Sequence, residues 1–154
     1  MIFTPRTAEG IIITIEIRLA ECSDAPELKK LNDLFNGENN NTVDAIEKSL
    51  FKNDAEIVCV AACGDELAGF CCGQFQASMC YSYEYAVITE FFIREKYRRQ
   101  GVGRRLLKFT EAEFIKRGVK HFHLSTGGDN AAALALYRSS GYDVTSVMLE
   151  KDAE

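Results

Sequence analysis

The sequence has 154 residues, of which 47% are hydrophobic and 27% are charged, and its formal net charge is −5 at pH 7. This length and composition predict one domain over residues 1–154 with a substantial core, and they exclude a disordered chain. The acidic balance argues against general attraction to nucleic acid. No apolar stretch is long enough for a membrane span, and the first ten residues show no signal-peptide pattern, so we expect a soluble, cytoplasmic protein.

The six cysteines are interpreted as reduced, small hydrophobic side chains rather than as disulfide or metal partners. Four of them lie in apolar, strand-like segments, and no pair has the C-x-x-C spacing of a metal or redox site. His121 and His123 stand two residues apart on one predicted strand, and two histidines alone rarely hold a metal. We therefore expect no metal site.

The first part of the chain predicts a strand followed by two helices. Residues 11–19 alternate β-branched and polar side chains, as a strand does. Ser23 can cap a helix that has Pro26 in its first turn, with Leu28, Leu31, Leu34 and Phe35 along one stripe. Residues 37–41 interrupt that helix, and a second short helix is predicted over residues 42–51. Loop freedom is greatest here, and segments of this kind often set substrate selectivity.

The middle and end of the chain predict further strands and helices in alternation. Residues 56–62 and 67–77 form a hairpin, and a link over residues 78–84 then leads to a strand at 87–93. The tyrosines at 81, 83 and 85 either line a pocket or edge a strand. A helix to about residue 117, a strand at 119–125, a helix that begins at Asp129 or Asn130, and a strand at 142–150 complete the order. These elements predict a mixed α+β fold, with a sheet covered by helices.

A basic, glycine-bearing loop joins the strand at 87–93 to the helix that follows it. Its sequence is Arg98-Arg99-Gln100-Gly101-Val102-Gly103, with Arg104 and Arg105 next. Glycine permits close approach of the backbone, and a helix start offers unpaired N–H groups and a partial positive charge. The loop is therefore a candidate phosphate site, although it is neither a Walker loop nor a dinucleotide fingerprint. The simpler alternative is an ordinary helix entry.

Two motifs resemble those of the GNAT superfamily of N-acetyltransferases. The loop R-x-x-G-x-G is similar to its pyrophosphate signature, and the stretch from Asn130 to Tyr142 matches N-x-x-A-x-x-L/F-Y-x-x-x-G-F/Y at every marked position. The opening of the chain is also similar, so the resemblance covers nearly its whole length. The chain departs from the pattern at Glu95, where relatives often have proline, and at Arg99, where glycine is common.

The resemblance implies a central mixed, mostly antiparallel sheet and acetyl-CoA as cosubstrate. Its pantetheine arm would pair with backbone near Phe92 and Ile93. The resemblance assigns the pyrophosphate to the stretch formed by Arg98, Arg99, Gln100, Gly101, Val102, Gly103 and Arg104. Asn130 would form a hydrogen bond to the pantetheine arm, in addition to capping the helix that it begins. Tyr137 would act as general acid toward the leaving thiol, while the acceptor amine attacks the thioester directly.

Glu90 is our candidate for the acceptor side, because it interrupts an otherwise apolar strand. It would act as base or would hold the cationic amine, and the simpler alternative is a charge at a solvated edge. We expect acetyl transfer to a small cationic amine of the polyamine or aminoglycoside type. The alternatives are acetylation of a protein N-terminus or lysine, and an acyl-CoA-binding sensor without turnover. The sequence leaves a homodimer open.

Overall fold

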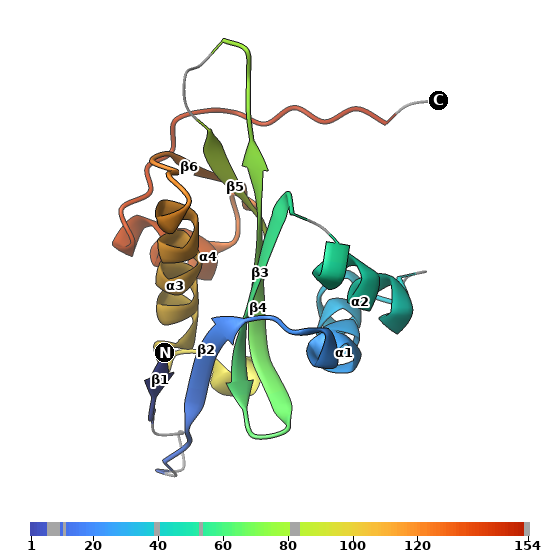
Figure 1. Cartoon of the computed structure of the whole chain (residues 1–154). Coiled ribbons are helices and arrows are strands. Elements are labelled where there is room, and N and C mark those ends of the chain that lie inside the picture. The colour runs from blue at the N-terminus through green and yellow to red at the C-terminus, as the bar shows by residue number, and fades with distance from the viewer. Residues whose placement is uncertain (6–9, 11, 39–40, 53, 81–83, 153–154) are drawn as a thin grey trace.

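The computed structural model describes residues 1–5, 10, 12–38, 41–52, 54–80 and 84–152 (Figure 1). Its strands are β1 (Ile2–Phe3), β2 (Ile15–Leu19), β3 (Glu56–Cys63), β4 (Glu66–Gln76), β5 (Tyr85–Ile93) and β6 (Phe122–Leu124). Its α-helices are α1 (Ala25–Asn36), α2 (Val43–Lys52), α3 (Val102–Lys116) and α4 (Ala131–Ser139), and the single 3₁₀ turns are η1 (Cys22–Asp24) and η2 (Glu95–Tyr97). None of the described helices has the length and apolar character needed to cross a bilayer.

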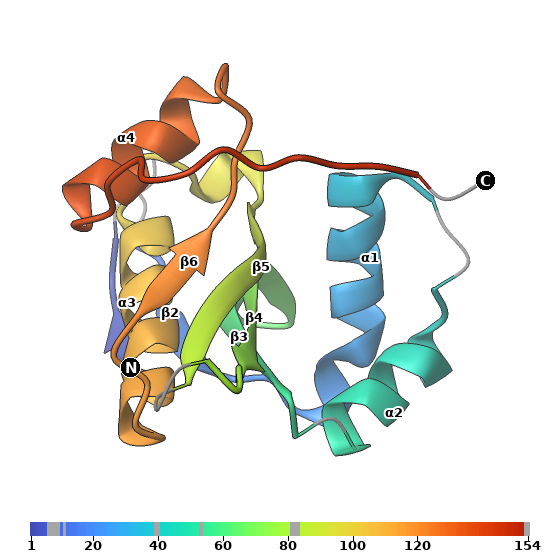
Figure 2. The same cartoon turned by 90° about the horizontal axis from the view of Figure 1, so that it is seen from above.

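The strands form one sheet in the order β1-β2-β3-β4-β5-β6. Each neighbouring pair is antiparallel except β5 and β6, which are parallel. Helices α3 and α4 lie on one side of the sheet, and α1 and α2 lie on the other (Figure 2). The expectation of a mixed, mostly antiparallel sheet flanked by helices is confirmed.

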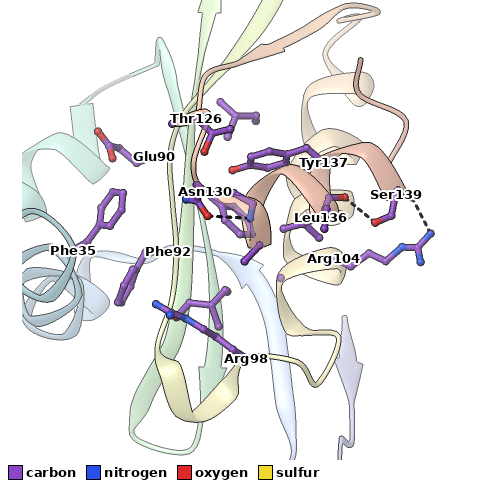
Figure 3. A pocket seen from close by; sticks show the side chains of 18 of the residues that line it. Phe35, Glu90, Phe92, Arg98, Arg104, Thr126, Asn130, Leu136, Tyr137 and Ser139 are labelled. Carbon is purple, nitrogen blue, oxygen red and sulfur yellow. Dashed lines mark hydrogen bonds between the residues drawn. The ribbon is translucent and has the colours of Figure 1, made fainter. Parts of the chain in front are cut away.

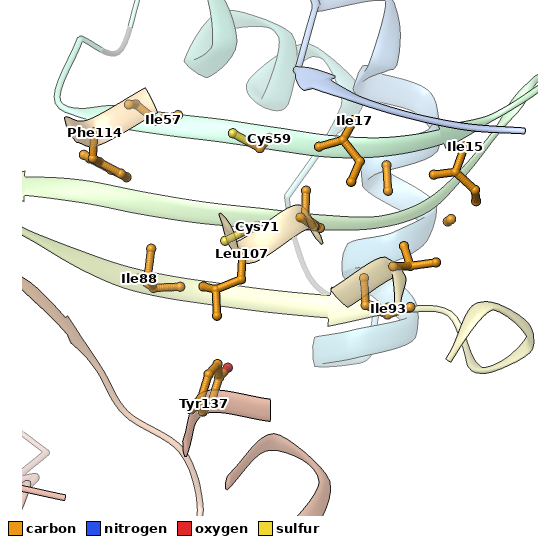
Figure 4. Close-up of a cluster of buried hydrophobic side chains, with 14 of the residues drawn as sticks. Ile15, Ile17, Ile57, Cys59, Cys71, Ile88, Ile93, Leu107, Phe114 and Tyr137 are labelled. Carbon is orange, nitrogen blue, oxygen red and sulfur yellow. The ribbon is translucent and has the colours of Figure 1, made fainter. Parts of the chain in front are cut away.

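Alternation of side chains along the strands supplies a hydrophobic core on each face of the sheet. On one face, Ile57 and Cys59 of β3 belong to the same buried cluster as Leu107 and Phe114 of α3 (Figure 4). On the other face, Val60 belongs to a second cluster that includes residues of α1 and β4. All six cysteines are free, and Cys59 and Cys71 are fully buried, so their interpretation as small hydrophobes holds for these two.

Three predicted strands were wrong in extent. The first spans only Ile15–Leu19, and the short strand β1, which no pattern predicted, pairs with it. The strand predicted at 119–125 is limited to Phe122–Leu124, because Val119 ends the turn after α3 by donating to the Phe114 carbonyl. Residues 142–150 form no strand; Tyr142 is half-buried, and the residues after it run exposed away from α4 (Figures 1 and 2). A three-residue β6 offers that segment little edge to pair with.

The predicted helices were close to their observed bounds. Asn130 rather than Asp129 caps α4, because its side-chain oxygen accepts from the Ala133 N–H at 3.1 Å. The second helix begins at Val43 and ends at Lys52, one residue later at each end than predicted. In the link over residues 78–84, the tyrosines at 81 and 83 lie outside the described residues.

Candidate functional site

A cavity of about 720 Å³ lies between α1, β5, the loop before α3, and α4 (Figure 3). It exists because β5 and β6 pair only from Ala86 to Ile88, and beyond Ile88 no described strand continues this edge of β5. Ten of the twelve predicted site residues line the cavity. They are Glu90, Phe92, Ile93, Arg98, Arg99, Gly101, Gly103, Arg104, Asn130 and Tyr137.

A β-bulge at Thr89 decides which face of the sheet each residue of β5 reaches. Cys72 is paired with Glu90 and Gly73 with Ile88, so Thr89 has no partner across the β4–β5 ladder. Ile88 and Phe91 both pack into the core cluster under α3, although three positions separate them. The bulge therefore turns Glu90 and Phe92 toward α1.

Hydrogen bonds fix the loop that precedes α3. The Arg98 Nε donates to the Ile93 carbonyl at 2.8 Å, and the Gln100 amide donates to the Lys96 carbonyl at 2.8 Å. Arg99 and Gly101 have positive φ angles of 61° and 79°, and Gly101 is the N-cap of α3. The first N–H groups of α3 lack an acceptor within the helix, so the loop holds them in place as a site for an anion.

Some side chains of the loop line the cavity, and others point elsewhere in the protein. The side chains of Gln100 and Val102 do not line the cavity, and Val102 is buried in the core. Arg104 lines it and donates to the Ser139 carbonyl at 3.3 Å. Arg105 instead lies over the ring of Phe3, away from the cavity. Only the backbone of Gln100 and Val102 can therefore serve the anion site.

Tyr137 is 7% exposed, and its hydroxyl points into the cavity (Figure 3). Its ring packs edge-on against Phe91 and Tyr142, with centroids 6.3 and 6.0 Å away. Burial, with a smaller contribution from Cys71, raises the pKa of Tyr137 to about 12. The phenol therefore keeps its proton throughout the neutral range and can act as a proton donor.

Glu90 lies across β5 from Tyr137, on the side that faces α1 and α2 (Figure 3). It is half-buried and paired in register with Cys72 of β4. Burial, and then the negative charge of Glu56, raise the pKa of Glu90 above its ordinary value. The charge of a cation close to Glu90 would lower this pKa again, and the ionised carboxylate would attract the cation.

The sequence did not predict several residues of the cavity, among them Phe35, Thr89, Thr126 and Leu136. The sequence places Phe35 on the apolar stripe of its helix, and that pattern does not distinguish a core residue from one that lines a pocket. Tyr85, one of the tyrosines considered for the pocket, instead packs against His123 with ring centroids 4.9 Å apart. Its side chain does not line the cavity.

The comparisons with known proteins agree with this geometry. The sequence profile of the Acetyltransferase (GNAT) family matches residues 23–142. The chain belongs to this family. This GNAT protein is also 39% identical over 62 residues to the [Ribosomal protein bS18]-alanine N-acetyltransferase of Escherichia coli (strain K12), a match that covers 40% of the chain and 42% of that protein. Its match to the Salmonella typhimurium (strain LT2) protein of the same name is 31% identical over 103 residues and covers 66% of each.

Solved structures show the same fold at low sequence identity. An aminoglycoside acetyltransferase from an uncultured soil metagenomic sample, in complex with trehalose, has a TM-score of 0.78 at 18% identity, with 91% of this chain and 97% of that chain covered. The structure of AAC(6')-Iy in complex with a bisubstrate analogue that contains CoA has a TM-score of 0.79 at 15% identity, with coverage of 91% and 98%. At these identities the likeness establishes the fold.

Proposed function

We propose that this protein is an acetyl-CoA-dependent N-acetyltransferase that acts on a primary amine, and that the amine is a small cationic molecule. The observation that carries the proposal is that one cavity joins the anion site at the loop to Tyr137 and Glu90, which lie on opposite sides of β5. A thioester held at the gap beside β5 would meet a proton donor from one side and an acceptor from the other. The cationic acceptor is supported by the Glu90 carboxylate, which lines the half of the cavity that faces α1.

The residues of the cavity fit acetyl-CoA, which supplies an activated acetyl thioester when bound. The N–H groups at the start of α3, with Arg104 and Arg99, would hold its pyrophosphate. Backbone N–H groups on the unpaired edge of β5 near Phe92 would bind the pantetheine arm and stabilise negative charge that develops on the carbonyl oxygen. Tyr137 would donate its proton to the departing sulfur.

The buried cysteines of β3 and β4 are poorly suited to act as nucleophiles in this reaction. Burial raises the pKa of the Cys59 thiol to about 11 and also raises that of Cys71. The raised pKa values of Cys71 and of Cys72 leave little thiolate to act as a nucleophile, which favours direct transfer to the amine.

A second candidate function is acetylation of a protein N-terminus. It is favoured by the two ribosomal-protein-alanine acetyltransferases to which this chain is similar in sequence. The matched segments cover only 42% and 66% of those proteins. The match therefore does not establish that this chain acts on the same acceptor. A sensor that binds acyl-CoA without turnover has no need for the hydroxyl that Tyr137 presents to the cavity.

Release of CoA thiol from acetyl-CoA, measured with a panel of amines, tests the proposed function. The panel should contain putrescine, spermidine, an aminoglycoside, a peptide with N-terminal alanine, and a lysine peptide with a blocked N-terminus. We expect thiol release to depend on the amine and to be fastest with the small polycations. Preference for the alanine peptide would establish the second candidate, and no release with any amine would support a sensor.

Gly101→Asp is expected to weaken acetyl-CoA binding by about tenfold or more, some 1.4 kcal/mol. The change places a negative charge and a side chain where backbone N–H groups would meet the pyrophosphate. Gly118→Asp is the matched control. It introduces the same residue at another positive φ, with open space around it, at the opposite end of α3 and about 22 Å away by helix rise. Calorimetric titration giving equal affinities for the two variants would remove the loop from the cofactor site.

Asn130 allows its capping role to be separated from a role in cofactor binding. Asn130→Ala removes the cap of α4 and should lower the free energy of unfolding by about 1 kcal/mol. Asn130→Asp keeps an oxygen that can accept from the Ala133 N–H but removes the amide donor that can reach the cavity. We expect the Asp variant to unfold at the wild-type denaturant concentration and to bind acetyl-CoA about fivefold more weakly. Wild-type affinity in that variant would leave Asn130 as a cap alone.

A further inference from the structure

The half of the cavity that faces α1 has a composition different from that of the cofactor half. Its lining includes the carboxylate of Glu90 and the rings of Phe35 and Phe92 (Figure 3). The cofactor half has Arg99, Arg104, the start of α3, and α4, and Arg98 lies between the halves, over the Phe92 ring. The arginines suit anions at the loop, and the carboxylate suits cations on the side toward α1.

Phe35 is placed so that its ring is available to a ligand. It lies at the C-terminal end of α1, and its ring contacts Phe92 and Phe70, with centroids 5.4 and 6.2 Å away. These contacts fix the ring, yet 40% of the residue remains exposed. In Figure 3 the Phe35 ring lies between Glu90 and Phe92. The Phe92 ring already has a cation, because the Arg98 guanidinium lies 5.8 Å from its centroid.

An ammonium ion is attracted both to a carboxylate and to the face of an aromatic ring. The amine that reacts must be uncharged when it attacks, so it gains little from such a site. An ammonium that stays protonated while another nitrogen of the same molecule reacts would use both interactions. The chemistry of this half of the cavity therefore fits an acceptor with two nitrogens.

We propose that Phe35 determines acceptor specificity, by forming with Glu90 a site for a second, non-reacting ammonium group of the acceptor. This inference rests on the proposed function and narrows its substrate class to amines that carry another cation. Phe35 does not contact the reacting atoms in this arrangement. Its substitution should therefore change the KM of the acceptor and leave the binding of acetyl-CoA unaltered.

Two acceptors that differ in one atom test the site. The first is putrescine whose far nitrogen is trimethylated, which has a permanent charge and no N–H donor at that end. The second is its neutral analogue, with carbon in place of that nitrogen. Wild-type protein should show a KM about tenfold lower for the cation. Phe35→Leu should reduce this preference about threefold, because the Glu90 carboxylate remains, and Phe35→Tyr should restore it. Phe51→Leu, at an exposed phenylalanine of α2 that does not line the cavity, should retain it.

Calorimetric titration of both molecules into the protein, with and without CoA, provides a readout that does not depend on turnover. Equal KM and equal affinity for the two molecules would overturn the inference, as would a preference of undiminished size in Phe35→Leu. Loss of fold in Phe35→Leu would appear in its circular dichroism, and Phe35→Ile then replaces it. If no amine is acetylated but the cation still binds better and needs Phe35, the proposed function fails while the cation site stands.

Discussion

Tyr137→Phe is expected to lower turnover about a hundredfold or more on the best acceptor, with little change in acetyl-CoA affinity. The substitution keeps the ring that packs against Phe91 and Tyr142 and removes the hydroxyl that points into the cavity. Because burial raises the pKa of Tyr137 to about 12, its deprotonation should produce no basic limb in the pH profile of kcat below about pH 10. Steady-state kinetics with acetyl-CoA in excess measure both quantities.

Tyr142→Phe is the matched control for this experiment. Its ring contacts that of Tyr137, but its hydroxyl donates to Glu111 at 2.9 Å, and the residue does not line the cavity. We expect the control to lose a little stability and to keep turnover within about threefold of wild type. If Tyr137→Phe turned over as fast as the control, Tyr137 would be a packing residue and the proton donor would lie elsewhere.

Glu90→Gln is expected to raise the KM of a dicationic acceptor about tenfold or more, at unchanged acetyl-CoA affinity. The carboxylate must be ionised to attract an ammonium, so wild-type KM should also rise as the pH falls through the pKa of Glu90. The neutral analogue of trimethylated putrescine should show neither effect. A fall in kcat with both acceptors, together with loss of the acidic limb of the pH profile, would instead make Glu90 a general base.

Glu90→Gln is also expected to increase the stability of the fold at neutral pH. Burial and the charge of Glu56 raise the pKa of Glu90 in the folded protein, so the folded state binds this proton more tightly than the unfolded state. Ionised Glu90 therefore destabilises the fold above its folded pKa, and this cost disappears as the pH falls below the unfolded value. Denaturant unfolding should show Glu90→Gln more stable than wild type at pH 7, with the difference vanishing in acid. A variant less stable at pH 7 would show that the carboxylate contributes to the fold.

Local patterns were sufficient to predict most elements of the fold. The recurrence of Leu106, Leu107, Thr110 and Phe114 at steps of three and four predicts α3, and all four are buried as it requires. A helix start is predicted within the loop over residues 98–103 and at Asp129 or Asn130, and the observed N-caps are Gly101 and Asn130. These signals depend on neighbours within about one turn of helix or a few residues of strand, which is why they are readable in the sequence.

The features that shape the cavity depend on partners far apart in the chain. The bulge at Thr89 arises from the register with β4, and alternation along β5 alone would have assigned Ile88 and Phe91 to opposite faces. Phe35 reaches the cavity because α1 packs on β4 and β5. The residues next to Phe35 in the sequence do not indicate this contact. The strand expected at 142–150 was wrong for the same reason, since its β-prone residues have no sufficient edge to pair with.

Mass spectrometry of a reaction with acetyl-CoA and the preferred amine tests the central claim of direct acetyl transfer. We predict acetylated amine and free CoA in equal amounts, with the intact protein at its unmodified mass at all times, including a sample quenched before the amine is added. Release of CoA without acetylated amine would contradict the claim. So would an acetyl group on the protein that forms first and is then passed to the amine.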